Sequence, residues 1–353
     1  MNKFTNPDVK VKVIGVGGAG GNAVLRMANS DSSHNLDFSA INTDVQALNR
    51  INKISTLAIG PALTRGMGSG GNPEIGKKAI RESQEEVTHI IEDADMVFIT
   101  AGMGGGTGTG GASIVAETAK KQGALTVAVV TLPFSFEGER RMEIANSGIE
   151  QLRKKVDTLI IIENDKLVSS IDTELSLEMA FDIADEVLKQ GIYGITEIFK
   201  IPGLINVDFA DIKTVMSNGG QSFMAIGGGK GKNASSEAVQ ATLANPLFNS
   251  PIKGAKHILF NIKGGPDLKM SQVHEIATVL KNATQSETHV IFGVVQCPKS
   301  KKRVSITLVA TGLISEKDTL PEIKNDLINE YLPYNTAIKM NSDQVKSPQP
   351  IHT

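Results

Sequence analysis

Short apolar runs alternate with amphipathic stretches through the first half of the chain, from residue 9 to 175. The apolar runs are rich in Val and Ile and have the length of strands; they lie at 9–17, 36–44, 94–102, 124–133 and 157–165. The stretches with helical periodicity lie at 20–29, 72–93, 108–123 and 138–156. Apolar strands that alternate with helices are typical of a parallel sheet covered on both faces. We therefore expect an α/β fold in which residues 9–175 form a Rossmann-like domain.

The pattern changes after residue 175. Residues 175–200 carry one apolar stripe at helical spacing and Pro202-Gly203 follows, so we expect a long, buried connecting helix at 176–201. Beyond it, strand-like runs lie at 221–229, 255–265, 288–296 and 302–312, and helical stretches lie at 208–220, 235–245 and 271–283. This order predicts a smaller α+β domain at 202–315. Residues 316–353 form a short tail, whose polar, proline-containing end is expected to be disordered.

The composition argues against several classes of protein. Hydrophobic residues make up 40% and charged residues 21% of the 353 residues, which is typical of a globular protein. The formal net charge of −2 provides no general basic surface, so we expect no nucleic-acid partner. The single Cys297 cannot form an internal disulfide, and no Cys/His cluster with metal spacing surrounds it. Because the N-terminus lacks a signal-peptide pattern and the apolar runs are short, we expect a cytoplasmic protein without direct membrane insertion.

Three glycine-rich loops, at residues 15–23, 63–74 and 100–113, are expected to follow strands. In a parallel α/β sheet the carboxyl ends of the strands hold the ligand, so the loops would converge on one edge. Glycine lets backbone N–H groups approach an anion, and the helix after each loop adds a partial positive charge. Three such loops predict a site for a nucleotide triphosphate. The alternative is that the glycines serve only as tight turns.

The third loop indicates how the phosphates would be held. Half of residues 100–113 are glycine and none is lysine, so the loop is not a P-loop. We expect backbone amides, the hydroxyls of Thr107 and Thr109 and a bound Mg²⁺ to hold the phosphates.

The first loop alone permits a different interpretation. Gly15, Gly17 and Gly20 match the dinucleotide fingerprint, and Asp44 lies at about the right distance downstream. This alternative is an NAD-dependent oxidoreductase. It leaves the third loop unexplained, and no catalytic acid or base can be nominated for it.

Several segments resemble one family. The segment GGGTGTG, residues 104–110, is similar to the signature loop of the tubulin/FtsZ GTPases. Over residues 9–313, similarity to FtsZ in order and spacing extends to GVGGAGGNAV, NTDVQAL, LTRGMGSGGNPEIG, PFSFEGERR, NDKL and NVDFADIKTVMSN. The resemblance implies a GTPase that takes GTP/GDP with Mg²⁺. It also implies head-to-tail assembly into filaments that scaffold the cell-division ring at mid-cell.

The resemblance implies a set of phosphate contacts. The first loop would meet the α/β-phosphates and the base through Gly20, Gly21 and Asn22. The second loop would face the γ-phosphate through Gly70, Gly71 and Asn72. The third loop would hold the β- and γ-phosphates through Gly104, Gly105, Gly106, Thr107, Gly108, Thr109 and Gly110.

The resemblance also implies contacts at the nucleoside end. Glu137 and Arg141 would contact the ribose, and Phe181 would stack on the base. Asn164 and Asp185 would read guanine, since a carboxylate that accepts two N–H bonds favours guanine over adenine. From the residues alone, Glu137 and Arg141 are an i,i+4 ion pair at a solvated helix start, and Phe181 is a core aromatic.

The segment NVDFAD supplies the catalytic residues that the resemblance implies. Asn206, Asp208 and Asp211 would position or polarise the water that attacks the γ-phosphate of the next subunit's GTP. Hydrolysis would then require assembly, and such head-to-tail contacts build open filaments. The structural alternative is that Asp208 caps a helix and both acids oppose its dipole. A further alternative is a filament-forming relative that binds GTP but hydrolyses it weakly or not at all.

The expected partners are further copies of this chain, together with unidentified adaptors and regulators of the division ring. Family members carry a C-terminal peptide that binds membrane adaptors, and residues 325–334 are a degenerate candidate here. The basic cluster at 299–303 lies between two predicted strands and is expected to be a solvated hairpin turn, with an acidic partner or nucleic acid as the alternative.

Overall fold

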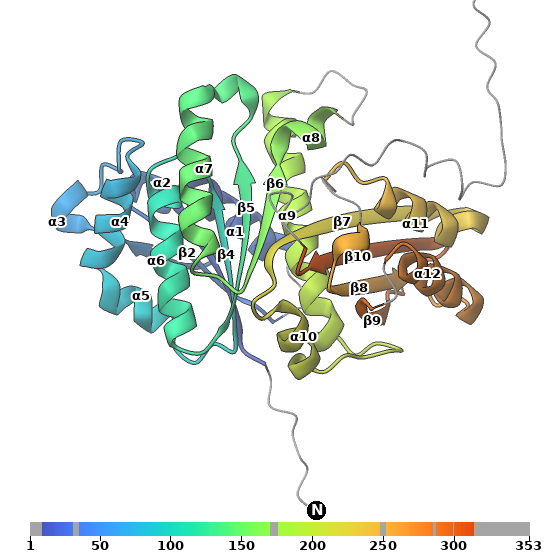
Figure 1. Cartoon of the computed structure of the whole chain (residues 1–353). Coiled ribbons are helices and arrows are strands. Elements are labelled where there is room, and N and C mark those ends of the chain that lie inside the picture. The colour runs from blue at the N-terminus through green and yellow to red at the C-terminus, as the bar shows by residue number, and fades with distance from the viewer. Residues whose placement is uncertain are drawn as a thin grey trace, which may run out of the picture. The chain divides into compact units, whose positions relative to one another are not determined.

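The computed structural model describes residues 9–30, 35–169, 176–247, 252–284, 287–298 and 300–313. Within these residues, ten strands form one sheet in the order β3-β2-β1-β4-β5-β6-β7-β10-β8-β9 (Figure 1). The strands of the first half are β1 (Val11–Val16), β2 (Asp37–Asn42), β3 (Ser55–Ala58), β4 (Met96–Gly102), β5 (Leu125–Leu132) and β6 (Thr158–Glu163). Each pairs in parallel with its neighbours among these six, which confirms the predicted α/β fold.

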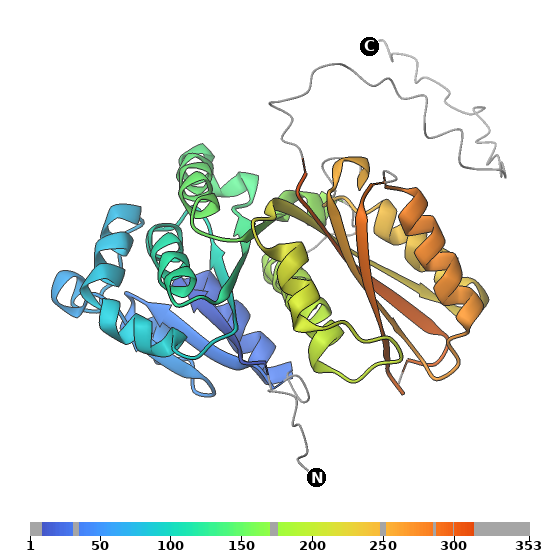
Figure 2. The same cartoon turned by 60° about the horizontal axis from the view of Figure 1, so that its bottom comes forward.

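Helices cover both faces of the parallel strands (Figure 2). One face carries α1 (Gly17–Ser30) and α9 (Leu177–Lys200). The other face carries α4 (Pro73–Glu82), α5 (Gln84–Ile91), α6 (Thr107–Lys121) and α7 (Glu139–Arg153). In β4, Phe98 is buried in the first cluster, whereas Val97 and Ile99 are buried in the second. Because successive side chains point to opposite covered faces, the strand reads as an unbroken apolar run.

Several short elements differ from the predictions. The strand β3 and the helices α2 (Val45–Leu48), α3 (Pro61–Thr64) and α8 (Asn164–Ser169) were not predicted. The second glycine-rich loop therefore follows α3, not a strand. The helix predicted at 72–93 is divided into α4 and α5 at Ser83, where the backbone leaves the helical conformation. The Ser83 hydroxyl there accepts a hydrogen bond from the Gly60 N–H at 3.2 Å.

The second half of the chain continues the same sheet. Its strands are β7 (Gly220–Lys230), β8 (His257–Gly264), β9 (His289–Gln296) and β10 (Arg303–Thr311), and its helices are α10 (Phe209–Met216), α11 (Ala234–Leu243) and α12 (Met270–Asn282). The predicted strands and helices are confirmed. The strand β7 joins β6 through only three residue pairs, Thr158↔Gly220 to Ile160↔Ser222. The strand β10 is antiparallel to both β7 and β8.

The helix α9 runs along the parallel sheet from the carboxyl ends of its strands to their amino ends. Near its start, the Phe181 ring lies 5.3 Å from that of Phe134, just after the carboxyl end of β5. At its end, Lys200 Nζ donates to the Asn35 carbonyl, just before β2, at 2.9 Å. Its 24 residues span about 36 Å at 1.5 Å per residue. None of the helices in the described ranges is long and apolar enough to cross a bilayer.

Candidate functional site

The three glycine-rich loops meet at the carboxyl edge of the sheet, where the strand order reverses between β1 and β4. A Cβ added at Gly17 would lie 2.8 Å from the Gly108 nitrogen, so the first loop rests on the third. A Cβ added at Gly106 would lie 2.7 Å from the Asn72 nitrogen, so the third loop rests on the second. Such distances exclude any side chain at these glycines. A reversal of strand order is where open α/β sheets bind ligands.

Other glycines of the same loops face open space. Cβ atoms added at Gly18, Gly70, Gly71 and Gly105 would have no atom within 4 Å. The first and third loops thus combine a glycine packed against a neighbouring loop with bare backbone that a ligand can approach, and the second loop contributes bare backbone at Gly70 and Gly71. The helices α1, α4 and α6 begin at these loops, and their free N–H groups favour an anion. Gly18 was not among the residues selected from the sequence.

Not every predicted loop residue is open to a ligand. Gly20 and Gly21 are buried, and a Cβ on Gly20 would lie 2.4 Å from the Thr100 carbonyl oxygen, whereas Asn22 is exposed. Gly104 has φ +101° and packs against the Arg141 carbonyl on α7. A Cβ on Gly110 would lie 1.9 Å from the Pro73 carbonyl oxygen. These glycines hold the loops in place by close packing.

The two threonines of the third loop have different environments. Thr107, the first residue of α6, has its hydroxyl 2.7 Å from the hydroxyl of Thr43 and 3.0 Å from that of Ser69. Thr109 Oγ1 accepts a hydrogen bond from the Gly104 N–H at 2.9 Å and so fixes the loop itself. Neither Thr43 nor Ser69 was selected from the sequence, because only the folded chain brings their hydroxyls together.

Two polar side chains near the loops cap helices. Asn72 Oδ1 accepts from the Glu74 N–H at 2.9 Å at the start of α4. Asp44 Oδ1 accepts from the N–H groups of Gln46 and Ala47, at 2.9 and 3.2 Å, at the start of α2. The Asp44 carboxylate is therefore engaged in capping, which argues against the ribose contact that the dinucleotide fingerprint requires.

The predicted Glu137–Arg141 ion pair is present. Glu137 ends the short 3₁₀ helix η1 (Ser135–Glu137), and its carboxylate also accepts from the Phe134 N–H at 2.9 Å. The Glu137 side chain is mostly buried, whereas that of Arg141 is 55% exposed. The pair lies beside the third loop, because Gly104 packs on the Arg141 backbone.

Asn164, Phe181 and Asp185 also lie at the carboxyl edge. Asn164 follows β6 directly and is buried, and its Oδ1 has no hydrogen-bond partner among the described residues. A buried acceptor without a partner is costly, so this atom is suited to a ligand N–H. Phe181 is 39% exposed and packs edge-to-face on Phe134. The interpretation of Phe181 as a core aromatic is therefore wrong.

The carboxyl group of Asp185 has a raised pKa. Burial raises the pKa of Asp185 to about 6, and the positive charge of Arg26 on α1 acts against this rise. Arg26 Nε lies 3.4 Å from the Asp185 carboxylate, and Arg26 also pairs with Asp182 one turn earlier on α9. A carboxylate with a pKa near neutrality is sensitive to any ligand that donates hydrogen bonds to it.

The three predicted catalytic residues lie elsewhere, at the amino edge of the sheet. Asn206 and Asp208 precede α10, Asp211 lies in its first turn, and all three are exposed. At the end of α10, the Met216 carbonyl accepts a hydrogen bond from the Thr158 hydroxyl, at the amino end of β6, at 2.6 Å. Asn206 Oδ1 accepts from the Gly203 N–H at 2.7 Å. Asp208 stands at the N-cap position, but its carboxylate accepts no hydrogen bond from α10, so the predicted side-chain cap is wrong.

The length of α9 separates these acids from the loops. Phe181 lies beside the nucleoside end, whereas Phe199 packs on Phe209 of α10 with ring centroids 5.4 Å apart. The two phenylalanines are eighteen positions apart on α9, which corresponds to about 27 Å along the helix axis. The fold therefore does not bring Asp208 and Asp211 to the glycine-rich loops of the same chain.

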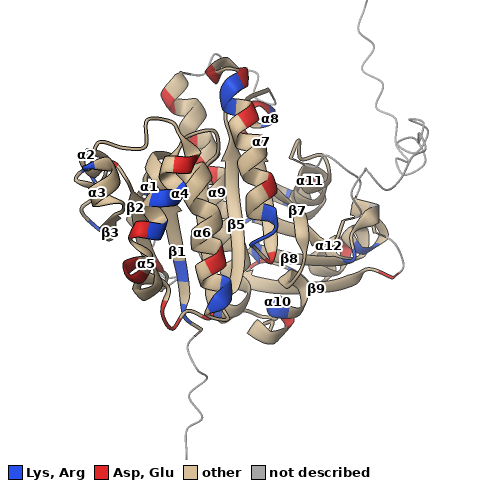
Figure 3. Ribbon diagram, turned by 60° about the vertical axis from the view of Figure 1, so that its left-hand side comes forward, with Lys and Arg blue, Asp and Glu red and all other residues tan. Residues whose placement is uncertain are grey.

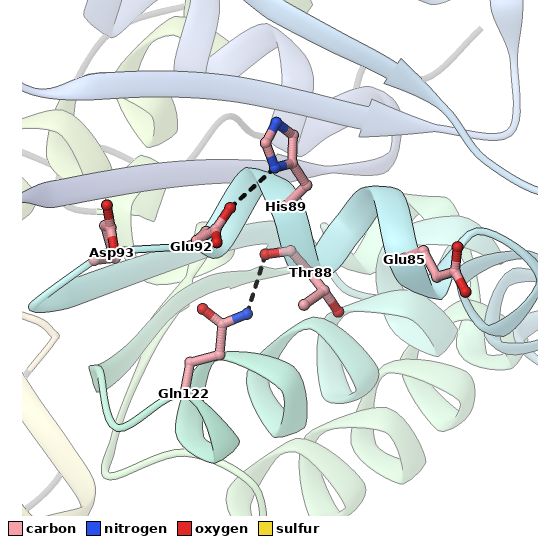
Figure 4. Close-up of a pocket in the computed structure, with 7 residues that line it drawn as sticks. Glu85, Thr88, His89, Glu92, Asp93 and Gln122 are labelled. Carbon is pink, nitrogen blue, oxygen red and sulfur yellow. Dashed lines mark hydrogen bonds and ion pairs between the residues drawn. The ribbon is translucent and has the colours of Figure 1, made fainter.

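A shallow hollow of about 470 Å³ lies between the end of α5 and the end of α6, away from the loops (Figure 4). Its polar groups pair with one another: His89 Nδ1 lies 3.0 Å from Glu92, and Gln122 Nε2 donates to the Thr88 carbonyl at 3.1 Å. Acidic and basic positions are interspersed along the ribbons of α4, α6 and α7, whereas α5 carries acidic positions and no Lys or Arg (Figure 3). Among the described residues, no group of three His, Cys, Asp or Glu could hold a metal ion.

Two family models match the chain. The GTPase domain of the tubulin/FtsZ family matches residues 10–172, and the C-terminal domain of the FtsZ family matches residues 220–314.

Several solved structures are also similar to this chain. The chain is similar to an empty FtsZ dimer from M. jannaschii, with 43% identity over 86% of this chain and 88% of that one and a TM-score of 0.82. A variant of M. jannaschii FtsZ gives 43% identity over 87% and 92%, with a TM-score of 0.83. GDP-bound CetZ1 from Haloferax volcanii, at 22% identity over 87% and 95% and a TM-score of 0.76, shares the fold.

Proposed function

Because this chain belongs to the FtsZ family of the tubulin/FtsZ GTPases, we propose that its three glycine-rich loops bind GTP and that a second copy completes the active site. The family function is that of a GTP-binding, filament-forming cell-division protein. An NAD-dependent oxidoreductase is set aside, since the family is a GTPase family and Asp44 caps α2.

The phosphates would lie over the open backbone at Gly18, Gly70, Gly71 and Gly105. The adjoining helix starts and the Thr107 hydroxyl provide N–H and O–H donors in place of a lysine. Since the described side chains offer no metal cluster, Mg²⁺ would be held mainly by phosphate oxygens and water. Such an ion would neutralise charge on the phosphates.

The nucleoside would lie between the start of α9 and the carboxyl ends of β5 and β6. The unpartnered Oδ1 of Asn164 and the carboxylate of Asp185 are acceptors, and guanine presents N–H groups where adenine does not. The half-exposed Phe181 ring offers a face for stacking, and Glu137 with Arg141 would meet the ribose.

Catalysis in trans is supported by one observation above all: the acids and the phosphate loops lie at opposite edges of the sheet. Asp208 and Asp211 are exposed at the amino edge, so they are free to meet the carboxyl edge of another copy. Their carboxylates, with Asn206, would orient the water that attacks the γ-phosphate. This contact joins two different surfaces and therefore repeats into an open filament.

The test is GTP hydrolysis per chain as a function of protein concentration in the presence of Mg²⁺. We expect a threshold concentration, followed by rising specific activity, because each complete site needs two chains. A constant, non-zero rate at all concentrations would assign the whole active site to one chain. Absence of turnover in filaments that contain GTP would favour the weakly catalytic alternative.

We further infer that the filaments act in the cytoplasm at the division site, together with adaptors and regulators. The family membership supports this location, but the candidate adaptor peptide at 325–334 lies outside the described residues. Residues 301 and 302 of the basic cluster form an exposed turn before β10, and residue 299 lies outside the described residues. The prediction of a hairpin is wrong, because β8 lies between β9 and β10 in the sheet.

A further inference from the structure

Three buried hydroxyl groups from three separate elements meet beneath the phosphate loops. Thr43 directly follows β2, Ser69 belongs to the second loop, and Thr107 begins α6. Thr107 Oγ1 lies between the other two, 2.7 Å from Thr43 Oγ1 and 3.0 Å from Ser69 Oγ. Thr43 is 1% exposed, and Ser69 and Thr107 are 7% exposed. Among the described residues, none of the three hydroxyls has another hydrogen-bond partner.

The number of protons restricts how these hydroxyls bond. Each hydroxyl can donate one hydrogen bond and accept two. The two contacts use two of the three available protons, so one proton is left over. If Thr107 donates to Thr43, the remaining proton belongs to Thr43, which is 1% exposed and has no acceptor among the described residues, so this arrangement is unfavourable. If Thr107 donates to Ser69, the remaining proton belongs to Ser69, which is 7% exposed. If Thr43 and Ser69 both donate to Thr107, the remaining proton belongs to Thr107.

The surroundings of Thr107 provide a use for that proton. Thr107 begins α6 and lies two residues after Gly105. A Cβ added at Gly105 would meet no atom within 4 Å, so the backbone there is open at the proposed phosphate site. An anion there is the missing acceptor, and a hydroxyl that accepts two hydrogen bonds becomes a stronger donor. The Ser69 hydroxyl also lies against the start of α6, since a Cβ on Gly106 would lie 2.3 Å from it.

We propose that Thr43 and Ser69 are positioning residues that donate to Thr107 and thereby direct its single O–H toward a phosphate oxygen of bound GTP. This inference rests on the proposed function, because it requires GTP at the three loops. It assigns a role to two side chains that do not touch the nucleotide. The proposed hydrogen bonds also link the end of β2 and the second loop to the start of α6. A bound anion would favour this arrangement, because it accepts the hydrogen bond from Thr107.

The experiment measures GTP affinity of the full chain, freed of nucleotide, at concentrations where no filament forms. Thr43→Val keeps the shape of the side chain and removes the hydroxyl, so we expect GTP affinity to fall roughly threefold to tenfold, as for one lost hydrogen bond. Ser69→Ala should reduce affinity by a similar factor. Thr43→Ser, which keeps the hydroxyl, should restore it. The matched control is Thr242→Val, because the buried Thr242 hydroxyl donates only to the Ala238 carbonyl within α11, away from the loops, and GTP affinity should be unchanged in this variant.

A double-mutant cycle decides whether the two residues act through Thr107. In a Thr107→Val background, Thr43→Val and Ser69→Ala should cause no further loss of GTP affinity. Full additivity in that background, or equal losses for Thr43→Ser and Thr43→Val, would overturn the inference while leaving GTP binding intact. If the unaltered chain binds no GTP, the proposed function and this inference both fail. Thermal unfolding without nucleotide verifies that every variant is folded.

Discussion

Asp185 is a single carboxyl group whose protonation should control guanine binding. Its pKa is raised to about 6 by burial, so the group is ionised at pH 8 and increasingly protonated below pH 6. Only the carboxylate can accept two N–H bonds from guanine. GTP affinity should therefore be constant above about pH 7 and fall as the pH decreases through 6, approaching tenfold per pH unit well below it. Binding titrations between pH 5 and 8 measure this.

The Asp185→Asn variant is the control for this pH dependence. The phosphates of GTP titrate in the same range, but they do so identically in both proteins. The variant should bind GTP weakly at pH 8, and between pH 8 and pH 5 it should show only the change caused by the phosphates, which is smaller than the change in the unaltered chain. Parallel pH profiles for the two proteins would show that Asp185 does not contact the base in its ionised form.

Arg26 should set the pH at which this change occurs. Its positive charge lowers the pKa of Asp185, against the larger effect of burial. In Arg26→Ala the pKa should rise above 6, so the loss of GTP affinity should begin at a higher pH than in the unaltered chain. Arg26→Lys keeps a positive charge on α1, and its profile should lie between the two. A midpoint that does not move in Arg26→Ala would mean that the pair, 3.4 Å apart, is not coupled.

The helices α4 and α6 pack so closely that a single methyl group should disturb them. A Cβ at Gly110 would lie 1.9 Å from the Pro73 carbonyl oxygen and 2.9 Å from the Lys77 nitrogen, and neither backbone atom can move freely. Gly110→Ala should therefore lower the free energy of unfolding by about 3 kcal/mol. Gly18→Ala is the matched control, since a Cβ there meets no atom within 4 Å. Denaturant unfolding without nucleotide compares the two, and equal stabilities would contradict the close packing.

The long elements were predictable because their sequence periodicity coincides with burial. In β4, Val97, Phe98 and Ile99 are all buried, and the run was recognisable as a strand. The short β3, by contrast, has an edge position and a mostly exposed pattern, so its sequence carries little signal. The break at Ser83 coincides with a hydrogen bond from the distant Gly60, and the join of β6 to β7 consists of three long-range pairs. Neither leaves a local mark in the sequence.

Some residues of the candidate site were likewise predictable from the sequence, whereas others were not. The glycine-rich loops were visible in the sequence because a tight backbone approach requires glycine. The roles of Asn164 and Asp185 came only from the family resemblance, because their spacing carries no chemical signature. Phe134, which packs on Phe181, and Thr43, which meets Thr107, were missed, since each acquires its neighbour only when distant elements meet.

The folded unit has two chemically different ends that complement each other. The carboxyl edge carries the phosphate loops and buried acceptors for guanine, whereas the amino edge carries exposed acids beside α10. Because α9 alone spans about 36 Å between the edges, no local rearrangement brings the two sets together in one chain. A second copy brings its acids to the loops of the first, and one end of each copy remains available for the next contact.

Mixing two inactive variants should therefore restore GTP hydrolysis. Asp185→Ala damages the nucleotide half of a junction and Asp211→Ala damages the acidic half, so each alone should be inactive. In an equal mixture about a quarter of the junctions combine two undamaged halves, which limits recovery to about that fraction of the unaltered activity. A mixture of Asp208→Ala with Asp211→Ala should recover nothing, because both changes affect the same half. If the first pair co-sediments in filaments yet releases no phosphate at any mixing ratio, the active site is not shared between subunits.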